Sequence, residues 1–350
     1  MSAATALLEV ADLHVHFPIR SGLLRRQTGA VRAVDGVSFA IERGEAFGLV
    51  GESGCGKTTV ARAVLQLVAP TSGSIVYDRR EVTGLSRARL ATFRRKVQAI
   101  FQDPFSSLNP RQKAGDILAE PIRVHRLRPE AGIAGRVAEL LDLCGLPRRF
   151  AELYPHEMSG GQRQRIGIAR ALAMEPELIV CDEAVSALDV SVQAQIVNLL
   201  AELRREFGLT YLFIGHDLSV VRWLCDRVAV MYLGRIMETA DSEWLFAHPA
   251  HPYTRALIDA APNPDPEAES GRAIEPLQGE PPSPAAPPPG CVFHPRCPIA
   301  VDRCRASAPP LDRVAPDIAP GHAAACWLAE PADPPARPQE PETVRQEMAT

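Results

Sequence analysis

One short segment has the residue types and spacing of a phosphate-binding loop. Residues 51–58 (GESGCGKT) match the pattern GxxxxGK[ST], between a predicted strand at 46–50 and a predicted helix at about 57–68. Glycines let consecutive backbone N–H groups point at a polyphosphate, and the start of a helix adds positive charge. Lys57 is expected to reach the β- and γ-phosphates, and Thr58 to bind Mg²⁺. The segment therefore predicts a nucleoside triphosphate site.

Two carboxylates follow a second predicted strand. Residues 178–181 (LIVC) are apolar, and Asp182 and Glu183 come directly after them. A buried strand would deliver both carboxylates to one site at its C-terminal end. Asp182 suits a Mg²⁺ site, and Glu183 could accept the proton of an attacking water. Together with the phosphate loop, this pair indicates hydrolysis of a nucleotide.

A second glycine motif precedes another predicted helix. Ser159-Gly160-Gly161-Gln162 lies directly before residues 163–174, which have a helical pattern. A serine N-cap, two glycines and a helix start form a second anion site. One chain thus carries two predicted phosphate-binding sites.

The elements that must position these motifs indicate an α/β sheet domain with a helical insertion. The compact apolar runs 178–181 and 211–214 are typical of buried parallel strands. Residues 191–206 are predicted to form an amphipathic helix, residues 18–30 a basic loop, and residues 112–176 a mostly helical insertion. The predicted strands are residues 7–17, 37–41, 46–50, 74–77, 97–101, 178–181 and 211–214.

The last quarter of the chain differs in composition. Of 32 prolines, 21 lie after Ala261, and residues 281–290 (PPSPAAPPPG) are typical of a linker. Four of the eight cysteines also lie there, spaced C-x5-C-x6-C-x21-C: Cys291, Cys297, Cys304 and Cys326. A short proline-rich segment has little apolar core and needs a cross-link, such as a disulfide or a metal site, to be stable. A reducing cytosol disfavours disulfides. Four thiolates suit a [4Fe–4S] cluster or Zn²⁺, with free thiols as a third alternative, and the spacing alone does not decide. The other cysteines are interpreted as packing or loop residues: Cys55, Cys144, Cys181 and Cys225.

The whole-chain composition limits the classes of function. The net charge of −4 gives no basic balance that would favour nucleic acid. The apolar runs are far shorter than the ~20 residues needed to cross a bilayer, and the first residues lack a signal-peptide pattern. We therefore expect a cytoplasmic chain that reaches a membrane only through partner subunits. Residues 329–350 are polar and proline-rich, which predicts disorder.

Taken in order, the motifs resemble those of ATP-binding cassette (ABC) transporter ATPases over roughly residues 5–260. Residues 51–58 correspond to the Walker A loop, residues 158–162 to the signature, and residues 178–183 to Walker B. The resemblance implies a P-loop NTPase fold of the ABC type. This is an α/β nucleotide-binding domain with a helical insertion, here followed by a small Cys/Pro-rich module at residues 261–328.

Single residues extend the resemblance. Gln102 matches the Q-loop, Asp189 the D-loop and His216 the switch histidine, while Phe17 lies where the family has an aromatic ring that stacks on adenine. The resemblance implies catalytic roles for Glu183, His216 and Gln102, and a Mg²⁺ ion held by Thr58, Gln102 and Asp182. The implied ATP-binding residues are Phe17, Gly51, Ser53, Gly54, Cys55, Gly56, Lys57, Thr58, Thr59, Ser159, Gly160, Gly161, Gln162 and Asp189. In this family, ATP lies between Walker A of one subunit and the signature of the other.

Four positions depart from the family pattern. Met158 replaces the usual Leu, Phe17 a common Tyr, Ala184 the usual Pro, and Gly215 the usual Ser or Thr. None of these changes removes a catalytic group. We expect Ala184 and Gly215 to affect turnover more than ATP binding.

Further segments resemble the ATPase subunits of oligopeptide, dipeptide and nickel importers, and most of all the second ATPase subunit of dipeptide importers. They are residues 102–110, 185–191, 251–254 and 279–284. This resemblance favours a [4Fe–4S] cluster over Zn²⁺ at the four C-terminal cysteines. It implies two integral-membrane permeases, a second ABC ATPase in a heterodimer, and an extracytoplasmic solute-binding protein, with no nucleic acid. The implied location is the cytoplasmic face of a prokaryotic cell membrane, with peptide uptake as the function.

Other functions explain less of the sequence. Import of nickel, glutathione or another small solute would use the same ATPase, because other chains select the solute. Soluble ABC ATPases that act on ribosomes or DNA carry two cassettes or long coiled coils, and this sequence shows neither. A P-loop kinase or GTPase would explain residues 51–58 but not the second glycine motif, Asp189 or His216.

Overall fold

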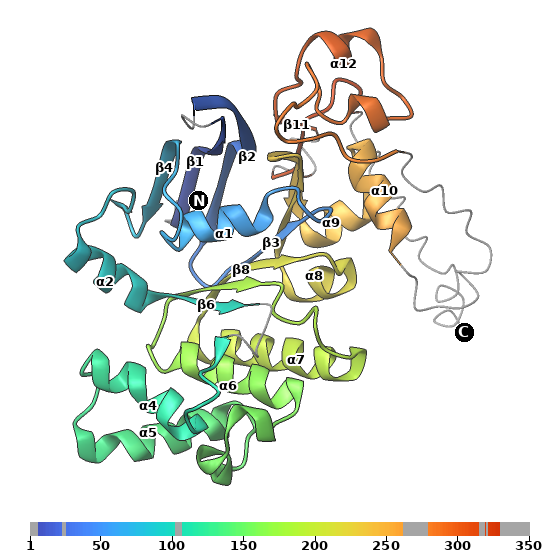
Figure 1. Cartoon of the computed structure of the whole chain (residues 1–350). Coiled ribbons are helices and arrows are strands. Elements are labelled where there is room, and N and C mark those ends of the chain that lie inside the picture. The colour runs from blue at the N-terminus through green and yellow to red at the C-terminus, as the bar shows by residue number, and fades with distance from the viewer. Residues whose placement is uncertain are drawn as a thin grey trace, which may run out of the picture.

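The computed structural model describes residues 6–22, 26–101, 107–261, 279–314, 319 and 321–329. Two sheets and the helices around them form its framework (Figure 1). Across these described residues, we find no helix with the length and apolar character needed to span a membrane.

The larger sheet has the strand order β11-β12-β10-β9-β3-β8-β7-β6, and the last five strands run parallel. Those five are β9 (Arg227–Tyr232), β3 (Ala46–Val50), β8 (Thr210–Gly215), β7 (Leu178–Asp182) and β6 (Val97–Phe101). Because the carboxyl ends of parallel strands lie at one edge of a sheet, the loops that follow β3, β7 and β8 meet there.

Alternate side chains of these strands face two different hydrophobic cores. In β7, Leu178 and Val180 belong to one core, while Ile179 and Cys181 belong to the other, and β3 and β8 divide in the same way. The first core contains α1 (Lys57–Val64), and the second contains α6 (Gly160–Leu172), α7 (Val190–Phe207) and α8 (Leu218–Leu224). Burial on both faces explains why these strands read as continuous apolar runs.

A smaller antiparallel sheet, with the order β2-β1-β4-β5, packs with α1 in the first core. Its strands are β1 (Ala6–Ser21), β2 (Arg26–Glu42), β4 (Ser72–Tyr77) and β5 (Arg80–Glu81). The helix α2 (Arg87–Lys96) follows β5 and leads into β6.

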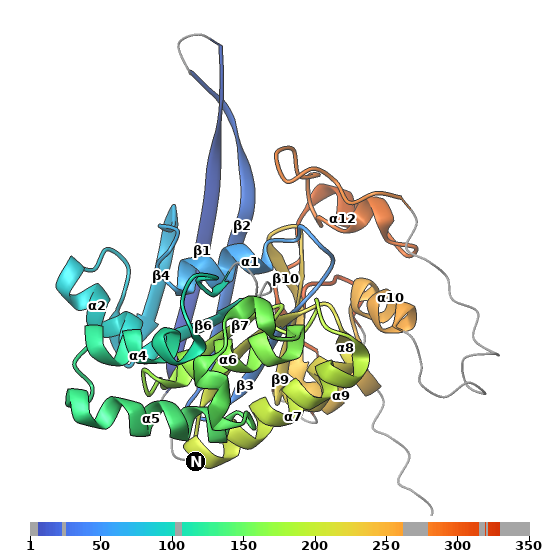
Figure 2. The same cartoon turned by 60° about the horizontal axis from the view of Figure 1, so that its bottom comes forward.

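The prediction of a basic loop over residues 18–30 is wrong. The strands β1 and β2 continue through this region as a paired hairpin, with Phe17 opposite Val31 and Arg20 opposite Gln27. Figure 2 shows the two arms reaching beyond the body of the molecule. At the outer end of this hairpin, residues 18–20, 27 and 28 are exposed, so backbone pairing forms the strands there without the burial that creates an alternating apolar pattern.

The segment predicted to be a helical insertion consists of helices in its described part. It contains α4 (Ala114–Val124), α5 (Glu130–Leu143), the short 3₁₀ helices η1 (Arg148–Glu152) and η2 (Pro155–Glu157), and α6. Their apolar side chains join the core that also holds α7 and α8. These helices therefore cover one face of the larger sheet.

The C-terminal segment extends the larger sheet. The strand β10 (Arg235–Asp241) pairs antiparallel with β9 and with β12 (Ala323–Ala324), which pairs with β11 (Asp312–Arg313). The other elements here are α9 (Ser242–Ala247), α10 (Pro252–Ala260), η3 (His294–Arg296) and α12 (Asp302–Ala306). Figure 1 places α12 at the end of the molecule opposite α4 and α5.

One fully buried polar contact joins this segment to β10. His322 Nε2 lies 2.7 Å from Glu238 Oε1, and Trp244 Nε1 donates a hydrogen bond to His322 Nδ1 at 3.1 Å. The same Glu238 carboxylate accepts the backbone N–H groups of Ala250 and His251. Both oxygens of this buried carboxylate therefore have hydrogen-bond partners. These contacts link three parts of the chain: β10, residues 250–251 and His322.

Candidate nucleotide-binding and hydrolysis site

The loop between β3 and α1 needs glycine for steric reasons. Gly51 has φ 148° and Gly56 has φ 110°. A Cβ atom on Gly51 would lie 2.1 Å from the carbonyl oxygen of Met231, and one on Gly56 would lie 2.1 Å from that of Ala33. The loop is therefore wrapped closely by backbone, as a polyphosphate cradle requires.

Lys57 is held inside this loop. Its ammonium donates hydrogen bonds to the carbonyl oxygens of Gly51, at 2.7 Å, and Glu52, at 2.9 Å, and only 5% of the residue is exposed. The positive charge therefore lies against the loop backbone. Ser53 and Gly54 form the exposed crest of the loop, Cys55 is buried, and Thr59 is half-buried.

The hydroxyl of Thr58 meets the first carboxylate at the end of β7. Thr58 Oγ1 donates a hydrogen bond to Asp182 Oδ1 at 3.1 Å. Burial raises the pKa of Asp182, and the charge of Glu183 adds to this rise. A buried carboxylate beside a hydroxyl, next to a phosphate loop, offers the hard oxygen ligands that suit Mg²⁺. Thr58 and Asp182 therefore fit the magnesium site that the sequence predicts.

Glu183 and His216 come together from neighbouring strands. Glu183 Oε1 lies 3.9 Å from His216 Nδ1, and the backbone N–H of Glu183 donates to the carbonyl oxygen of Ile214 in β8. Glu183 has φ 51°, in the left-handed region that non-glycine residues rarely adopt. Both residues line a cavity of about 60 Å³, which is large enough for water.

Ala184 and Gly215, which depart from the family pattern, lie beside Glu183 and His216 in the sequence. Ala184 is buried, and a Cβ atom on Gly215 would lie 3.2 Å from Cε1 of Phe213. The usual Ser or Thr at position 215 would therefore crowd Phe213, whereas glycine leaves that ring in place.

The second glycine motif opens α6 as a capped helix. The Ser159 hydroxyl accepts a hydrogen bond from the Gln162 backbone N–H at 3.3 Å, and Gln162 Oε1 accepts from the Ser159 N–H at 2.9 Å. Gly161 is buried, and a Cβ atom there would lie 2.4 Å from Cγ1 of Val192. Asp189 caps α7 by accepting the backbone N–H of Val192 at 3.0 Å. The second glycine motif and Asp189 thus form one packed unit at the starts of α6 and α7.

The two glycine motifs of one chain lie on opposite faces of the larger sheet. The phosphate loop leads into α1 in one core, and the second motif leads into α6 in the other.

Two of the predicted residues, Phe17 and Gln102, are not part of the contacts described above. Phe17 lies on β1 of the hairpin and is 42% exposed, with its ring available for stacking. Gln102 lies outside the described residues, so its predicted role stays a prediction.

The four C-terminal cysteines are close enough to influence one another. Burial raises the pKa of the thiols of Cys291, Cys297 and Cys326, and the charge of neighbouring cysteines, including Cys304, raises it further. None of the eight cysteines forms a disulfide. Burial also raises the pKa of Cys55 and of Cys181, and raises that of Cys144 to about 12, as expected of packing residues.

No three of the four C-terminal cysteine sulfurs lie within 4.8 Å of one another. Among the described residues, only His14, His16 and Asp35 bring three ligand atoms within 4.8 Å of one another. Sulfurs bound to a single zinc lie roughly 3.8 Å apart, given a Zn–S distance of about 2.3 Å. A four-iron cluster binds each cysteine at a different corner and keeps the sulfurs further apart.

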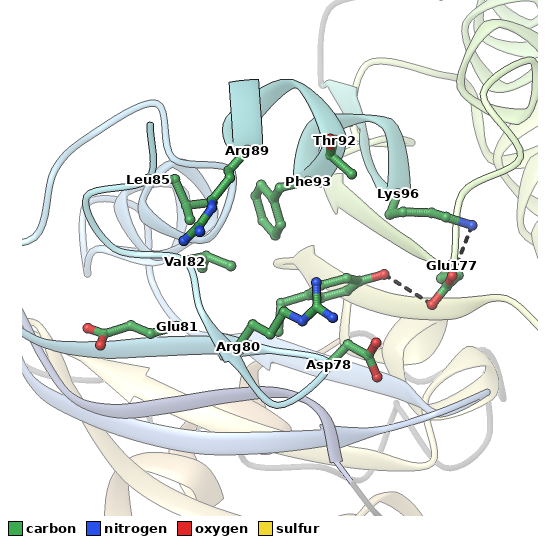
Figure 3. Close-up of a pocket in the computed structure, with 11 residues that line it drawn as sticks. Asp78, Arg80, Glu81, Val82, Leu85, Arg89, Thr92, Phe93, Lys96 and Glu177 are labelled. Carbon is green, nitrogen blue, oxygen red and sulfur yellow. Dashed lines mark hydrogen bonds and ion pairs between the residues drawn. The ribbon is translucent and has the colours of Figure 1, made fainter. Parts of the chain in front are cut away.

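A larger cavity lies away from the motif residues. It measures about 700 Å³ and is bounded by β4, β5 and α2, and Figure 3 shows Val82 and Phe93 facing its interior. Glu177 at its margin pairs with Lys96 at 3.0 Å and accepts a hydrogen bond from the Tyr77 hydroxyl at 3.2 Å. None of the predicted site residues lines this cavity.

The phosphate loop also contacts the C-terminal third of the chain, which no sequence pattern predicts. The Glu52 N–H donates to the Tyr253 hydroxyl at 2.9 Å, and the Glu52 carboxylate pairs with Arg296. Glu52 occupies a variable position of the GxxxxGK[ST] pattern, and no local signal connects it to residues more than 200 positions away.

Comparisons with known proteins identify the family. The family described as "ABC transporter" matches residues 34–186, and the "Oligopeptide/dipeptide transporter, C-terminal region" family matches residues 237–304. The solved structure of cbiO1 from Clostridium perfringens is 29% identical, with a TM-score of 0.61, over 69% of this chain and 91% of that one. A dimeric post-hydrolysis structure of the ATP-binding cassette MJ0796, bound to ADP and Pi, is 28% identical, with a TM-score of 0.60, over 67% of this chain and 98% of that one.

Two full-length relatives are more similar. The probable peptide ABC transporter ATP-binding protein y4tS of Sinorhizobium fredii is 53% identical, over 93% of this chain and 91% of its own length. The oligopeptide transport ATP-binding protein AppF of Bacillus subtilis is 50% identical, over 94% of this chain and 99% of its own length. The chain belongs to the ABC transporter family and is an ABC-type ATPase. Its C-terminal region is that of the oligopeptide/dipeptide branch, so the family predicted from the motifs is confirmed.

Proposed function

We propose that this chain is the ATP-hydrolysing subunit of a peptide importer. One observation carries the proposal: the carboxyl ends of β3, β7 and β8 bring Lys57, Thr58, Asp182, Glu183 and His216 to one edge of the sheet. The names of y4tS and AppF support peptide or oligopeptide as the transported class. The match to an oligopeptide/dipeptide C-terminal region supports it as well.

The residues at this edge can divide the work of hydrolysis. The phosphate loop and Lys57 bind the β- and γ-phosphates, and Mg²⁺ held by Thr58 and Asp182 would neutralise phosphate charge. Glu183 accepts the proton of the attacking water as its oxygen bonds to the γ-phosphorus, and the bond to the bridging oxygen breaks to release ADP. His216, 3.9 Å from Glu183, orients the water and the γ-phosphate. Gln102 is proposed as a further ligand near Mg²⁺.

A second ATPase subunit would complete the site. Ser159 is exposed at the N-terminus of α6, and the phosphate loop of the same chain lies on the opposite face of the sheet. We therefore propose a head-to-tail pair in which Ser159, Gly160, Gly161 and Gln162 of one subunit bind the γ-phosphate held by the other. A helix N-terminus with free N–H groups suits that phosphate.

A groove between the sheet and the helical insertion offers a surface for a permease. It measures about 570 Å³ and lies between β6 and α4. Three exposed apolar side chains line it: Leu67, Phe101 and Val124. Exposed apolar side chains gathered in a groove suit an amphipathic helix of another protein. Two permeases and a solute-binding protein would complete an importer, with this chain peripheral on the cytoplasmic face of a prokaryotic cell membrane.

We also propose that the C-terminal cysteines hold a [4Fe–4S] cluster within a module of residues 261–328, after an ATPase domain of residues 5–260. The charge effects between the four thiols place them near one another, and four thiolates suit such a cluster. The cluster would act as a staple for a segment with little apolar core. Iron and acid-labile sulfide in anaerobically purified protein would support this proposal, and stoichiometric zinc without iron would contradict it. The proposed disordered tail is residues 329–350, of which residues 330–350 lie outside the described residues.

The catalytic assignment is tested by Glu183→Gln. The amide keeps the shape of the side chain but cannot accept the proton, so we expect hydrolysis to fall by about a thousandfold while ATP binding persists. Phosphate release and binding of a fluorescent ATP analogue measure the two effects. Normal turnover in this variant would show that Glu183 is not the base.

The transported class is tested in proteoliposomes that contain the chain and its genomic neighbours. ATP-dependent uptake of labelled di- and oligopeptides is expected. Uptake of nickel or glutathione in place of peptide would retain the ATPase role and overturn the peptide assignment.

A further inference from the structure

The phosphate loop and the C-terminal module meet at a partly buried ion pair. Arg296 Nη1 lies 2.7 Å from Glu52 Oε2, and Arg296 Nη2 lies 3.0 Å from Glu52 Oε1. The Arg296 side chain is 5% exposed, and that of Glu52 is 27% exposed. These hydrogen bonds to Glu52 raise the pKa of Arg296. This is the two-pronged geometry in which arginine binds a carboxylate most strongly.

Three groups of Glu52 make polar contacts: its carboxylate, its backbone N–H and its carbonyl oxygen. Its carboxylate binds Arg296, its N–H donates to the Tyr253 hydroxyl on α10, and its carbonyl oxygen accepts from Lys57. Glu52 therefore contacts both Lys57 of the phosphate loop and the C-terminal part of the chain.

Aromatic packing holds Arg296 in place. The guanidinium lies 5.8 Å from the ring centre of Tyr232, and the Tyr232 hydroxyl lies 3.4 Å from Nη1. The Tyr232 ring packs on Tyr253 and on Phe293, with ring centres 4.7 and 5.4 Å apart. All three rings are almost completely buried. The module therefore presents Arg296 on a rigid support.

We propose that Arg296 is a positioning residue for ATP: it neutralises Glu52 and holds it away from the triphosphate. The proposal rests on the ATPase function proposed above. A carboxylate in the phosphate loop repels a triphosphate unless a positive charge compensates it. Arg296 supplies that charge from a segment distant in sequence, so ATP affinity depends on the C-terminal module.

The proposal is tested by Arg296→Gln in the full chain, measured as the dissociation constant of a fluorescent ATP analogue. The uncompensated Glu52 should weaken binding by about tenfold, while kcat at saturating ATP stays within about twofold because the pair does not contact the attacking water. Arg303→Gln is the matched control, since Arg303 stacks on Trp327 in the same module, and should bind like the wild type.

The double variant Arg296→Gln/Glu52→Gln separates charge compensation from a structural role. Removing the carboxylate should restore affinity to within about threefold of the wild type. Affinity in the double variant as weak as in Arg296→Gln would overturn the proposal, as would wild-type affinity in Arg296→Gln itself. Wild-type protein that binds no ATP would instead refute the proposed function.

Arg296→Lys keeps the test decisive if Arg296→Gln does not fold. Lysine retains the charge, so affinity within about threefold of the wild type supports compensation. A tenfold loss in Arg296→Lys, with an unchanged melting temperature, would overturn it.

Discussion

The phosphate loop and the second glycine motif both place glycines at the start of a helix, but each motif requires glycine for a different physical reason. In the phosphate loop, Gly51 and Gly56 have positive φ and face backbone carbonyl oxygens at distances no Cβ could tolerate. In the second motif, Gly161 is helical, and its closest neighbour is a side chain of α7. The glycines of the first loop are packed against the backbone of neighbouring strands, whereas the second motif is a helix end packed against a side chain of α7.

Gly56→Ala should have the largest effect of the substitutions that test this contrast. A methyl group 2.1 Å from the Ala33 carbonyl oxygen forces the backbone to move, so ATP affinity should fall by about a hundredfold or more. Gly54→Ala is the matched control, because Gly54 has positive φ but open space around it, and it should lose much less. Equal losses in the two variants would show that conformation, and not close approach, sets the requirement.

Gly161→Ala should have an intermediate effect of a different kind. The added methyl group meets Val192 and displaces the start of α7, so hydrolysis by the assembled ATPase should fall by about tenfold. ATP binding to the single chain should be unchanged, because the phosphate loop is on the other face of the sheet. The double variant Gly161→Ala/Val192→Ala removes the clash and should recover most of the activity. A loss of single-chain ATP binding would contradict the division between the faces.

Ser159→Ala should have the smallest effect of the three substitutions, and this effect is on the stability of the fold. It removes one N-cap hydrogen bond of α6 and should lower the free energy of unfolding by about 1 kcal/mol in urea denaturation. Ser159→Asn retains a cap and should keep the stability. If Ser159 also binds the partner's nucleotide, hydrolysis should fall further than this stability change explains. A purely stabilising role predicts normal turnover of folded protein.

The sequence predicts those parts of the molecule in which a local pattern reflects a local physical demand. Strands β7 and β8 follow from uninterrupted apolar runs because both faces of the sheet are buried, and the phosphate loop follows from glycines that nothing else can replace. The outer end of the hairpin formed by β1 and β2 could not be predicted, because backbone pairing stabilises it there while the side chains of residues 18–20, 27 and 28 are exposed to solvent.

Contacts between residues that are far apart in the sequence also cannot be predicted from local sequence patterns. The partners Glu52 and Arg296 are a loop residue at a variable motif position and one of many arginines. Only the folded chain shows that a bidentate ion pair joins them. The buried pair of Glu238 and His322 is of the same kind, because neither residue type predicts burial by itself.

The pairing of β12 with β10 also determines how the ATPase domain behaves when isolated. Through Glu238 opposite Ala324 and Thr239 opposite Ala323, the short strand β12 occupies backbone groups along β10 that would otherwise be exposed. A chain cut after residue 260 would present β10 as an open edge strand and leave Glu238 buried without His322. Open edges recruit strands from other molecules, so the shortened domain would tend to self-associate. The C-terminal segment thus protects the ATPase from aggregation, whatever its cysteines bind.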